Sequence, residues 1–93
     1  MLFIATYHGK PELPKIDVRE KARKWWNEGE CPKGLKLLAS YRPLSTEEPS
    51  VMVFQAESSE DIAKLVSYWH EWSFDILPAL DEMEAWRAQG MKI

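Results

Sequence analysis

The segment Val51–Ala56, with the sequence VMVFQA, is almost wholly apolar, and polar loop residues precede it. Short apolar runs of this length are typical of strands that are buried on both faces. We therefore predict that this segment is the central strand of a sheet. A chain of 93 residues is about the size of one domain, so residues 1–93 are expected to form a single domain around this strand.

Three further segments carry the β-branched, aromatic and alternating side chains that are typical of strands. They are Leu2–His8, Leu35–Leu44 and Ser73–Leu80. The polar stretch from Ser45 to Ser50 predicts a hairpin loop before the central strand. Pro78 has no backbone N–H to donate, so the last strand is expected at an edge of the sheet or at a bulge.

The first predicted helix spans about residues 18–29, where apolar side chains recur at helical spacing. Asp17 precedes it as a good N-cap, and Glu20 stands where the second half of a capping box would be. Gly29 follows the last periodic residues and is expected to end the helix.

A second helix is expected to begin at Ser58, whose hydroxyl can cap the backbone N–H of Asp61. Its apolar positions form a single stripe along one side: Ile62, Leu65, Val66, Trp69 and Trp72. Residues 81–91 predict a short final helix, capped by Asp81 and ended by Gly90, with Met91 as its last residue.

The element order is therefore βαββαβ with a short C-terminal helix, which is an α+β, ferredoxin-like arrangement. Both long helices then cover one face of a four-stranded antiparallel sheet and leave the other face bare. An exposed apolar sheet face marks an interaction surface, so we expect two copies to pack sheet to sheet as a homodimer. The residues expected at this dimer interface are Phe3, Tyr7, Leu38 and Phe54.

Four stretches of the chain resemble a known family: MLFIATYH, CPKGLKLLASYR, VMVFQAESSEDIAKLVSYW and FDILPALD. They are similar to the domain of unknown function 3303 family, whose members belong to the dimeric α/β-barrel superfamily. The likeness covers residues 1–82 and is most specific in Pro-x-Gly-Leu, Phe-Gln, the tryptophan of the second helix and Ile-x-Pro. It implies a homodimer whose two sheets close into one barrel. It implies no reaction, because the family carries no established activity.

Charge and composition exclude several classes of protein. The chain has 12 basic and 15 acidic side chains, a net charge of −3, which argues against nucleic acid as a partner. The central strand also lacks the basic residue and paired aromatics of an RNA recognition motif. Cys31 is the only cysteine, so no intramolecular disulfide or thiolate metal cage can form, and a cytoplasmic location is expected. No metal, cofactor or membrane span is expected.

Aromatic side chains and the two histidines are the candidate ligand residues. We expect Trp26 and Trp69 in the core under the helices, and Trp25, Trp72 or Trp86 at an interface. A cleft between the helices and the sheet would bind a compact apolar or aromatic molecule. The residues expected to contact it are His8, Trp26, Tyr41, Trp69 and His70.

Two other functions are compatible with the sequence, which identifies no catalytic residue. The resemblance admits a cofactor-free or haem-dependent monooxygenase, because some members of that superfamily have such activities and Trp69 and His70 could serve it. Thr6 and Tyr7, however, stand on the first strand where a haem-degrading member has an Asn, and Trp69 and His70 are adjacent instead of spaced for one pocket. The remaining alternative is an interaction or scaffold protein that binds no small molecule.

Overall fold

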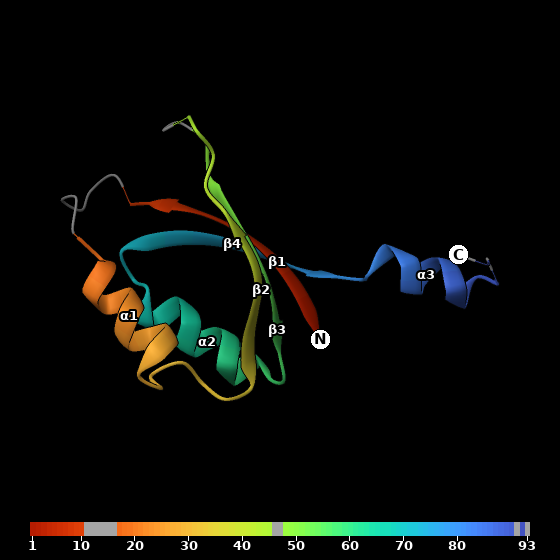
Figure 1. The fold of residues 1–93 in the computed structure, drawn as a ribbon, viewed down its shortest axis with the longest axis horizontal. Coiled ribbons are helices and arrows are strands. Elements are labelled where there is room, and N and C mark those ends of the chain that lie inside the picture. The colour runs from red at the N-terminus through yellow and green to blue at the C-terminus, as the bar shows by residue number, and fades with distance from the viewer. Residues whose placement is uncertain (11–16, 46–47, 91, 93) are drawn as a thin grey trace.

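The computed structural model describes residues 1–10, 17–45, 48–90 and 92, and it has the predicted α+β element order. Figure 1 shows the two longer helices together on one side of a sheet, with the third helix far from them. The elements are β1 (Leu2–Gly9), α1 (Arg19–Asn27), β2 (Leu35–Tyr41), β3 (Ser50–Ala56), α2 (Ser59–Tyr68), β4 (Trp72–Ala79) and α3 (Glu82–Ala88).

The four strands form one antiparallel sheet in the order β2-β3-β1-β4. The prediction that Val51–Ala56 lies in a central strand is confirmed, and Pro78 lies in an edge strand as its missing N–H requires. The register shifts between Leu37 and Ala39, so β2 carries a bulge there. β2 ends at Tyr41, short of the predicted Leu44, and residues 46–47 of the predicted hairpin loop lie outside the described residues.

The hydrophobic core lies between the sheet and helices α1 and α2. Met52 and Phe54 of β3 and Leu65 of α2 are almost fully buried, because alternate strand residues and one stripe of each helix turn toward the same space. The buried set is Ala5, Trp25, Leu35, Met52, Phe54, Ala56, Leu65 and Trp69.

Three of the four residues predicted at the dimer interface lie on the helix-covered face instead. Phe54 is 1% exposed, and Phe3 stacks on it with ring centroids 5.5 Å apart. Tyr7 packs against Trp72 at 5.0 Å between ring centroids. Only Leu38, which is 45% exposed, lies on the uncovered face. The prediction for Phe3, Tyr7 and Phe54 is wrong because a shift of one residue in strand phase moves every side chain to the other face.

The two adjacent tryptophans of α1 also exchange their predicted places. Trp25 is 1% exposed and packs against Tyr68, with ring centroids 4.4 Å apart, whereas Trp26 is 39% exposed. Neighbouring helix residues project about 100° apart, so only one of the pair can face the sheet. The prediction of a buried Trp69 is confirmed, since it is 3% exposed.

The start of α1 differs from the predicted capping box. The helix begins at Arg19, with Val18 in the N-cap position and no side-chain cap. Asp17 still accepts a hydrogen bond from the Arg19 backbone N–H at 3.0 Å, and its carboxylate pairs with the Arg19 guanidinium. Glu20 pairs with Arg23 one turn later instead of reaching back to the helix start. Gly29, with φ of 82°, follows α1 and adopts the left-handed conformation that glycine favours.

The predicted cap of α2 is confirmed, and it lies against a glycine. The Ser58 hydroxyl accepts a hydrogen bond from the Asp61 backbone N–H at 3.3 Å. A Cβ on Gly34 would lie 2.2 Å from the Asp61 carboxylate and 3.2 Å from the Cβ of Glu57. The Gly34 carbonyl also accepts a hydrogen bond from the Glu57 backbone N–H at 3.0 Å. A larger residue in place of the glycine of Pro-x-Gly-Leu would therefore displace the Asp61 side chain and crowd Glu57 at the start of α2.

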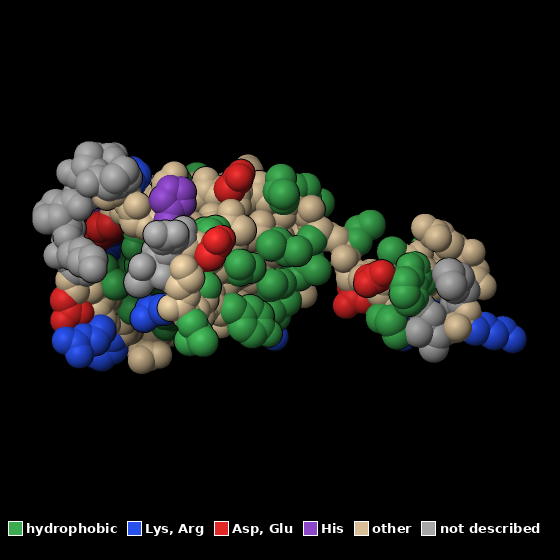
Figure 2. All heavy atoms as spheres, turned by 90° about the horizontal axis from the view of Figure 1, so that it is seen from above, with side chains coloured by type: hydrophobic (Ala, Val, Ile, Leu, Met, Phe, Trp, Pro, Cys, Tyr) green, Lys and Arg blue, Asp and Glu red, His purple; other side chains and the backbone are tan. Residues whose placement is uncertain are grey.

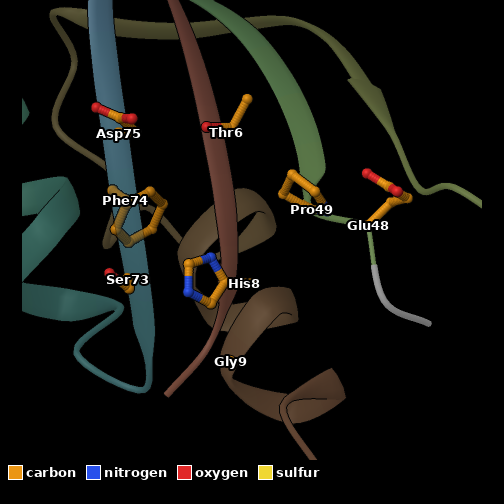
Figure 3. Close-up of a pocket in the computed structure, with 8 residues that line it drawn as sticks. All are labelled: Thr6, His8, Gly9, Glu48, Pro49, Ser73, Phe74 and Asp75. Carbon is orange, nitrogen blue, oxygen red and sulfur yellow. The ribbon is translucent and has the colours of Figure 1, made fainter. Parts of the chain in front are cut away.

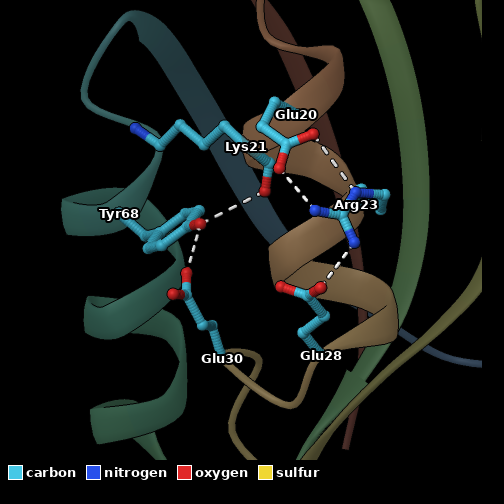
Figure 4. Close-up of polar contacts among 6 residues, drawn as sticks. All are labelled: Glu20, Lys21, Arg23, Glu28, Glu30 and Tyr68. Carbon is cyan, nitrogen blue, oxygen red and sulfur yellow. Dashed lines mark hydrogen bonds and ion pairs between the residues drawn. The ribbon is translucent and has the colours of Figure 1, made fainter.

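Polar contacts tie α1 to α2 and to the turn that follows it. The Tyr68 hydroxyl lies 3.2 Å from the Lys21 carbonyl oxygen and also contacts the Glu30 carboxylate, as Figure 4 shows. The hydrogen bond to Glu30 is the main cause that raises the pKa of Tyr68 to about 12. The Lys21 ammonium donates to both carboxylate oxygens of Glu71, at 2.8 and 2.9 Å, and lies over the rings of Tyr68 and Trp69.

The Lys21–Glu71 pair predicts a specific dependence of stability on pH. Burial works to raise the pKa of Glu71, but the hydrogen bonds and charge of Lys21 outweigh it and hold that pKa below the ordinary 4.5. The stabilisation is therefore complete above pH 4.5 and is lost as the pH falls through the lowered folded-state value. In urea unfolding at pH 3 to 6, Glu71→Gln should flatten the acid-side fall of the unfolding free energy. An unchanged slope in that variant would contradict this assignment.

The third helix stands apart from the rest of the molecule. Figure 1 shows α3 at the end of β4, beyond the side of the sheet that faces away from α1 and α2. None of its residues is buried. It begins as predicted at Asp81, whose carboxylate accepts from the backbone N–H groups of Met83 and Glu84 at 2.9 and 3.1 Å. The predicted last residue, Met91, lies outside the described residues.

Candidate functional site

One face of the sheet is covered by neither α1 nor α2, and we call it the open face. Its members follow from the strand register, because the residues between the buried ones project to the opposite side. The open face consists of Leu2, Ile4, Thr6 and His8 of β1, Lys36, Leu38, Ala39 and Tyr41 of β2, Val51, Val53 and Gln55 of β3, and Ser73, Asp75, Leu77 and Ala79 of β4.

The middle of the open face is apolar and exposed. Ile4 is 41% exposed and pairs with Leu77, which is 64% exposed, and Val53 flanks Ile4 on its other side. A hollow of about 490 Å³ lies toward α3, where Leu38 and Leu80 are among its lining residues. Figure 2 shows hydrophobic side chains gathered at the end of the body that faces α3. Contiguous exposed apolar surface of this kind is typical of a contact or ligand surface.

The other end of the open face is polar and hollowed. The register places His8 beside Ser73 and Thr6 beside Asp75, so these four side chains form a block across β1 and β4. Together with Glu48, from the chain that enters β3, they line a hollow of about 670 Å³ (Figure 3). Side chains in neighbouring antiparallel positions lie about 5 Å apart, within reach of one small ligand group.

A smaller hollow of about 280 Å³ adjoins this block and adds a cation to it. His8 and Glu48 line both hollows, and Arg42, which follows β2, lines only the smaller one. An imidazole, a guanidinium, carboxylates and hydroxyls therefore surround one region of the sheet. Such a set can both donate and accept hydrogen bonds. Among the described residues, no group of three or more His, Cys, Asp or Glu side chains could hold a metal ion.

Comparison of the chain with protein-family models matches residues 1–91 to the model described as "Domain of unknown function (DUF3303)". The chain belongs to the DUF3303 family. The match includes the open face, its polar block and α3, so all three are parts of the DUF3303 unit. A search of curated proteins found no match. In the parts of this DUF3303 chain that the structure describes, no helix is long and apolar enough to cross a membrane.

The five residues predicted to contact a ligand do not meet in the DUF3303 chain. His8 and Tyr41 lie on the open face, whereas Trp69 lies in the core on the other side of the sheet. Trp26 is exposed on α1, and the side chain of His70 is 69% exposed, with Nε2 3.9 Å from the Glu71 carboxylate. The predicted cleft between helices and sheet is filled there by the packed rings of the core.

Sequence reasoning missed Thr6, Ser73, Asp75 and Glu48 as parts of the polar hollow of the DUF3303 fold. Thr6 and His8 are two residues apart in one strand, as are Ser73 and Asp75 in another, so each pair projects to one face. This spacing in the sequence predicts that the two side chains of each pair share one face of the sheet. What joins the pairs is the register of β1 on β4, which connects residues far apart in the chain.

Proposed function

We propose that this DUF3303 protein is a homodimer in which the open faces of two copies pack together and enclose a binding cavity for a small molecule. The observation that carries the proposal is an exposed apolar surface, centred on Ile4 and Leu77, that runs into a polar hollow at His8 and Asp75. Packing of two such faces would remove the apolar part from water and close the hollow on its open side.

The surface area of the chain supports a dimer. A compact folded monomer of 10.9 kDa is expected to expose about 5,600 Å². This chain exposes 7151 Å². The surplus of about 1,600 Å² per chain is in the range that obligate homodimers bury. Burial of this surplus against a second copy would bring the surface per chain to that of an ordinary folded protein.

The polar hollow supports binding of a compact ligand with an aromatic or apolar body and one polar group. Its volume of about 670 Å³ is within the usual range of small-molecule sites. His8, Thr6 and Ser73 would donate or accept hydrogen bonds at the polar group, while Asp75 would accept one. Phe74 and Pro49, which also line this hollow, would contact the body of the ligand.

A calorimetric titration with 2-naphthol, which has a compact aromatic body and one hydroxyl, tests the ligand site. We expect one molecule to bind per chain. His8→Ala should raise the dissociation constant about tenfold, since it removes one hydrogen bond that fixes the polar group.

The other histidine provides the matched control for this titration. His70 is exposed in the turn between α2 and β4 and is not among the residues that line the hollow, so His70→Ala should leave the dissociation constant unchanged. Equal weakening by the two substitutions would contradict a site at His8. Absence of any binding by the wild-type dimer would leave an interaction protein without a ligand as the better description.

A further inference from the structure

The helix α3 has an exposed apolar side. Leu80, Met83 and Trp86 are spaced three residues apart and are 79%, 40% and 38% exposed. Residues at this spacing lie on one side of a helix. Leu80 immediately precedes the cap residue Asp81 and extends this side toward β4.

The local sequence specifies this helix well, yet the helix is too short to be stable alone. Asp81 caps its start, and Gly90, with φ of 85°, follows its end. Isolated helices of fewer than about 12 residues are marginal in water. A capped helix of 7 residues therefore needs a surface to pack on.

The chain's own body does not supply that surface in this structure. Figure 2 shows α3 joined to the body by a narrow connection, with open space between them. The radius of gyration is 15.2 Å, whereas a compact chain of this length is expected to have about 12.3 Å. The position of α3, which stands apart from the core in Figure 1, contributes to this excess.

The position and charge of α3 indicate a second copy as its partner. α3 lies on the side of the sheet toward which the open face points, which is where the second copy of the proposed dimer would lie (Figure 1). The α3 segment contains Asp81, Glu82 and Glu84 but only Arg87 as a cation. On the open face of a partner, Lys36 of β2 would offer the opposite charge, and Arg42 lies beside the polar hollow of that face. The surplus surface of the chain also includes α3 and is large enough for an obligate dimer.

We propose that α3 of each copy packs on the body of the other copy through Leu80, Met83 and Trp86. The dimer would then be held by an exchange of C-terminal helices in addition to the contact between open faces. The inference rests on the proposed homodimer and adds a second, separable contact to it. It assigns α3 the role of a dimerisation arm.

Sedimentation equilibrium of Trp86→Ala tests the arm. Truncation of a tryptophan that anchors an interface should raise the dimer dissociation constant about thirtyfold. Trp26→Ala is the matched control, because Trp26 has nearly the same exposure, 39% against 38%, but lies on α1. We expect the control to dimerise as the wild type does. Circular dichroism should show both variants folded, since neither side chain is in the core.

A mixed dimer of isotope-labelled and unlabelled copies gives a second readout that needs no substitution. Nuclear Overhauser effects filtered for contacts between chains should connect the Trp86 indole to the partner. If the wild type is a dimer but Trp86→Ala leaves its dissociation constant unchanged, or if Trp86 contacts only its own chain, the arm is overturned and the dimer stands. If the wild type is a monomer at every concentration, the proposed dimer itself fails and the arm fails with it.

Discussion

Leu77→Asp is expected to convert the protein from a dimer into a monomer. Leu77 lies in the middle of the open face and is 64% exposed in the single chain, beside Ile4 on β1. In the proposed dimer, its burial would place one unpaired carboxylate from each copy between the sheets. Burial of an unpaired charge costs several kcal/mol, so the dissociation constant should rise at least about a hundredfold.

The fold of the single chain should tolerate this substitution. Because residue 77 already contacts water in the monomer, Leu77→Asp should change the monomer's unfolding free energy by about 0.5 kcal/mol or less. Val66→Asp is the control, since Val66 is also an exposed apolar residue, 40% accessible, but lies on α2. Sedimentation equilibrium gives the mass of each variant and so distinguishes a dimer from a monomer. A dimeric Leu77→Asp protein, or an equally monomeric Val66→Asp protein, would contradict a dimer through the open face.

Trp25→Ala is expected to cause a large loss of stability. Trp25 is 1% exposed, and its ring lies 4.4 Å from that of Tyr68 and 6.4 Å from that of Trp69, measured between centroids. Removal of a buried aromatic ring leaves a cavity and costs about 3–5 kcal/mol. Small domains have only about 5–15 kcal/mol of stability in total, so the variant should lie near the limit of folding.

The neighbouring tryptophan provides a test of this assignment within one helix. Trp26 meets Trp25 edge to face at 6.0 Å but is 39% exposed, so Trp26→Ala should cost no more than about 1 kcal/mol. Urea unfolding followed by circular dichroism measures both variants. Equal losses of unfolding free energy from the two substitutions, or a larger loss from Trp26→Ala, would show that α1 does not turn Trp25 toward the sheet.

Local sequence signals were sufficient for the order of the elements and for the central strand. The apolar run Val51–Ala56 has few alternatives to a buried strand, and Ser58 caps α2 as its sequence context indicates. The start of α1 could not be placed as well. Asp17 and Glu20 have the spacing of a capping box, but Arg19 and Arg23 compete for their carboxylates.

The faces of the strands could not be assigned from the sequence, because both faces of β1 carry apolar side chains. Leu2 and Ile4 alternate with Phe3 and Ala5, so alternation alone does not say which set the helices cover. The same ambiguity holds for the two tryptophans of α1. In each case, which side chains are buried depends on packing between elements far apart in the chain. The polar block at His8 depends likewise on the pairing of β1 with β4.

The solution mass of the wild-type protein tests the proposed assembly most directly. Sedimentation equilibrium at micromolar concentrations should give twice the chain mass of 10.9 kDa. The open face and α3 would then both have a partner. A mass of 10.9 kDa at every concentration would contradict the dimer, and with it the enclosed ligand cavity and the exchange of C-terminal helices.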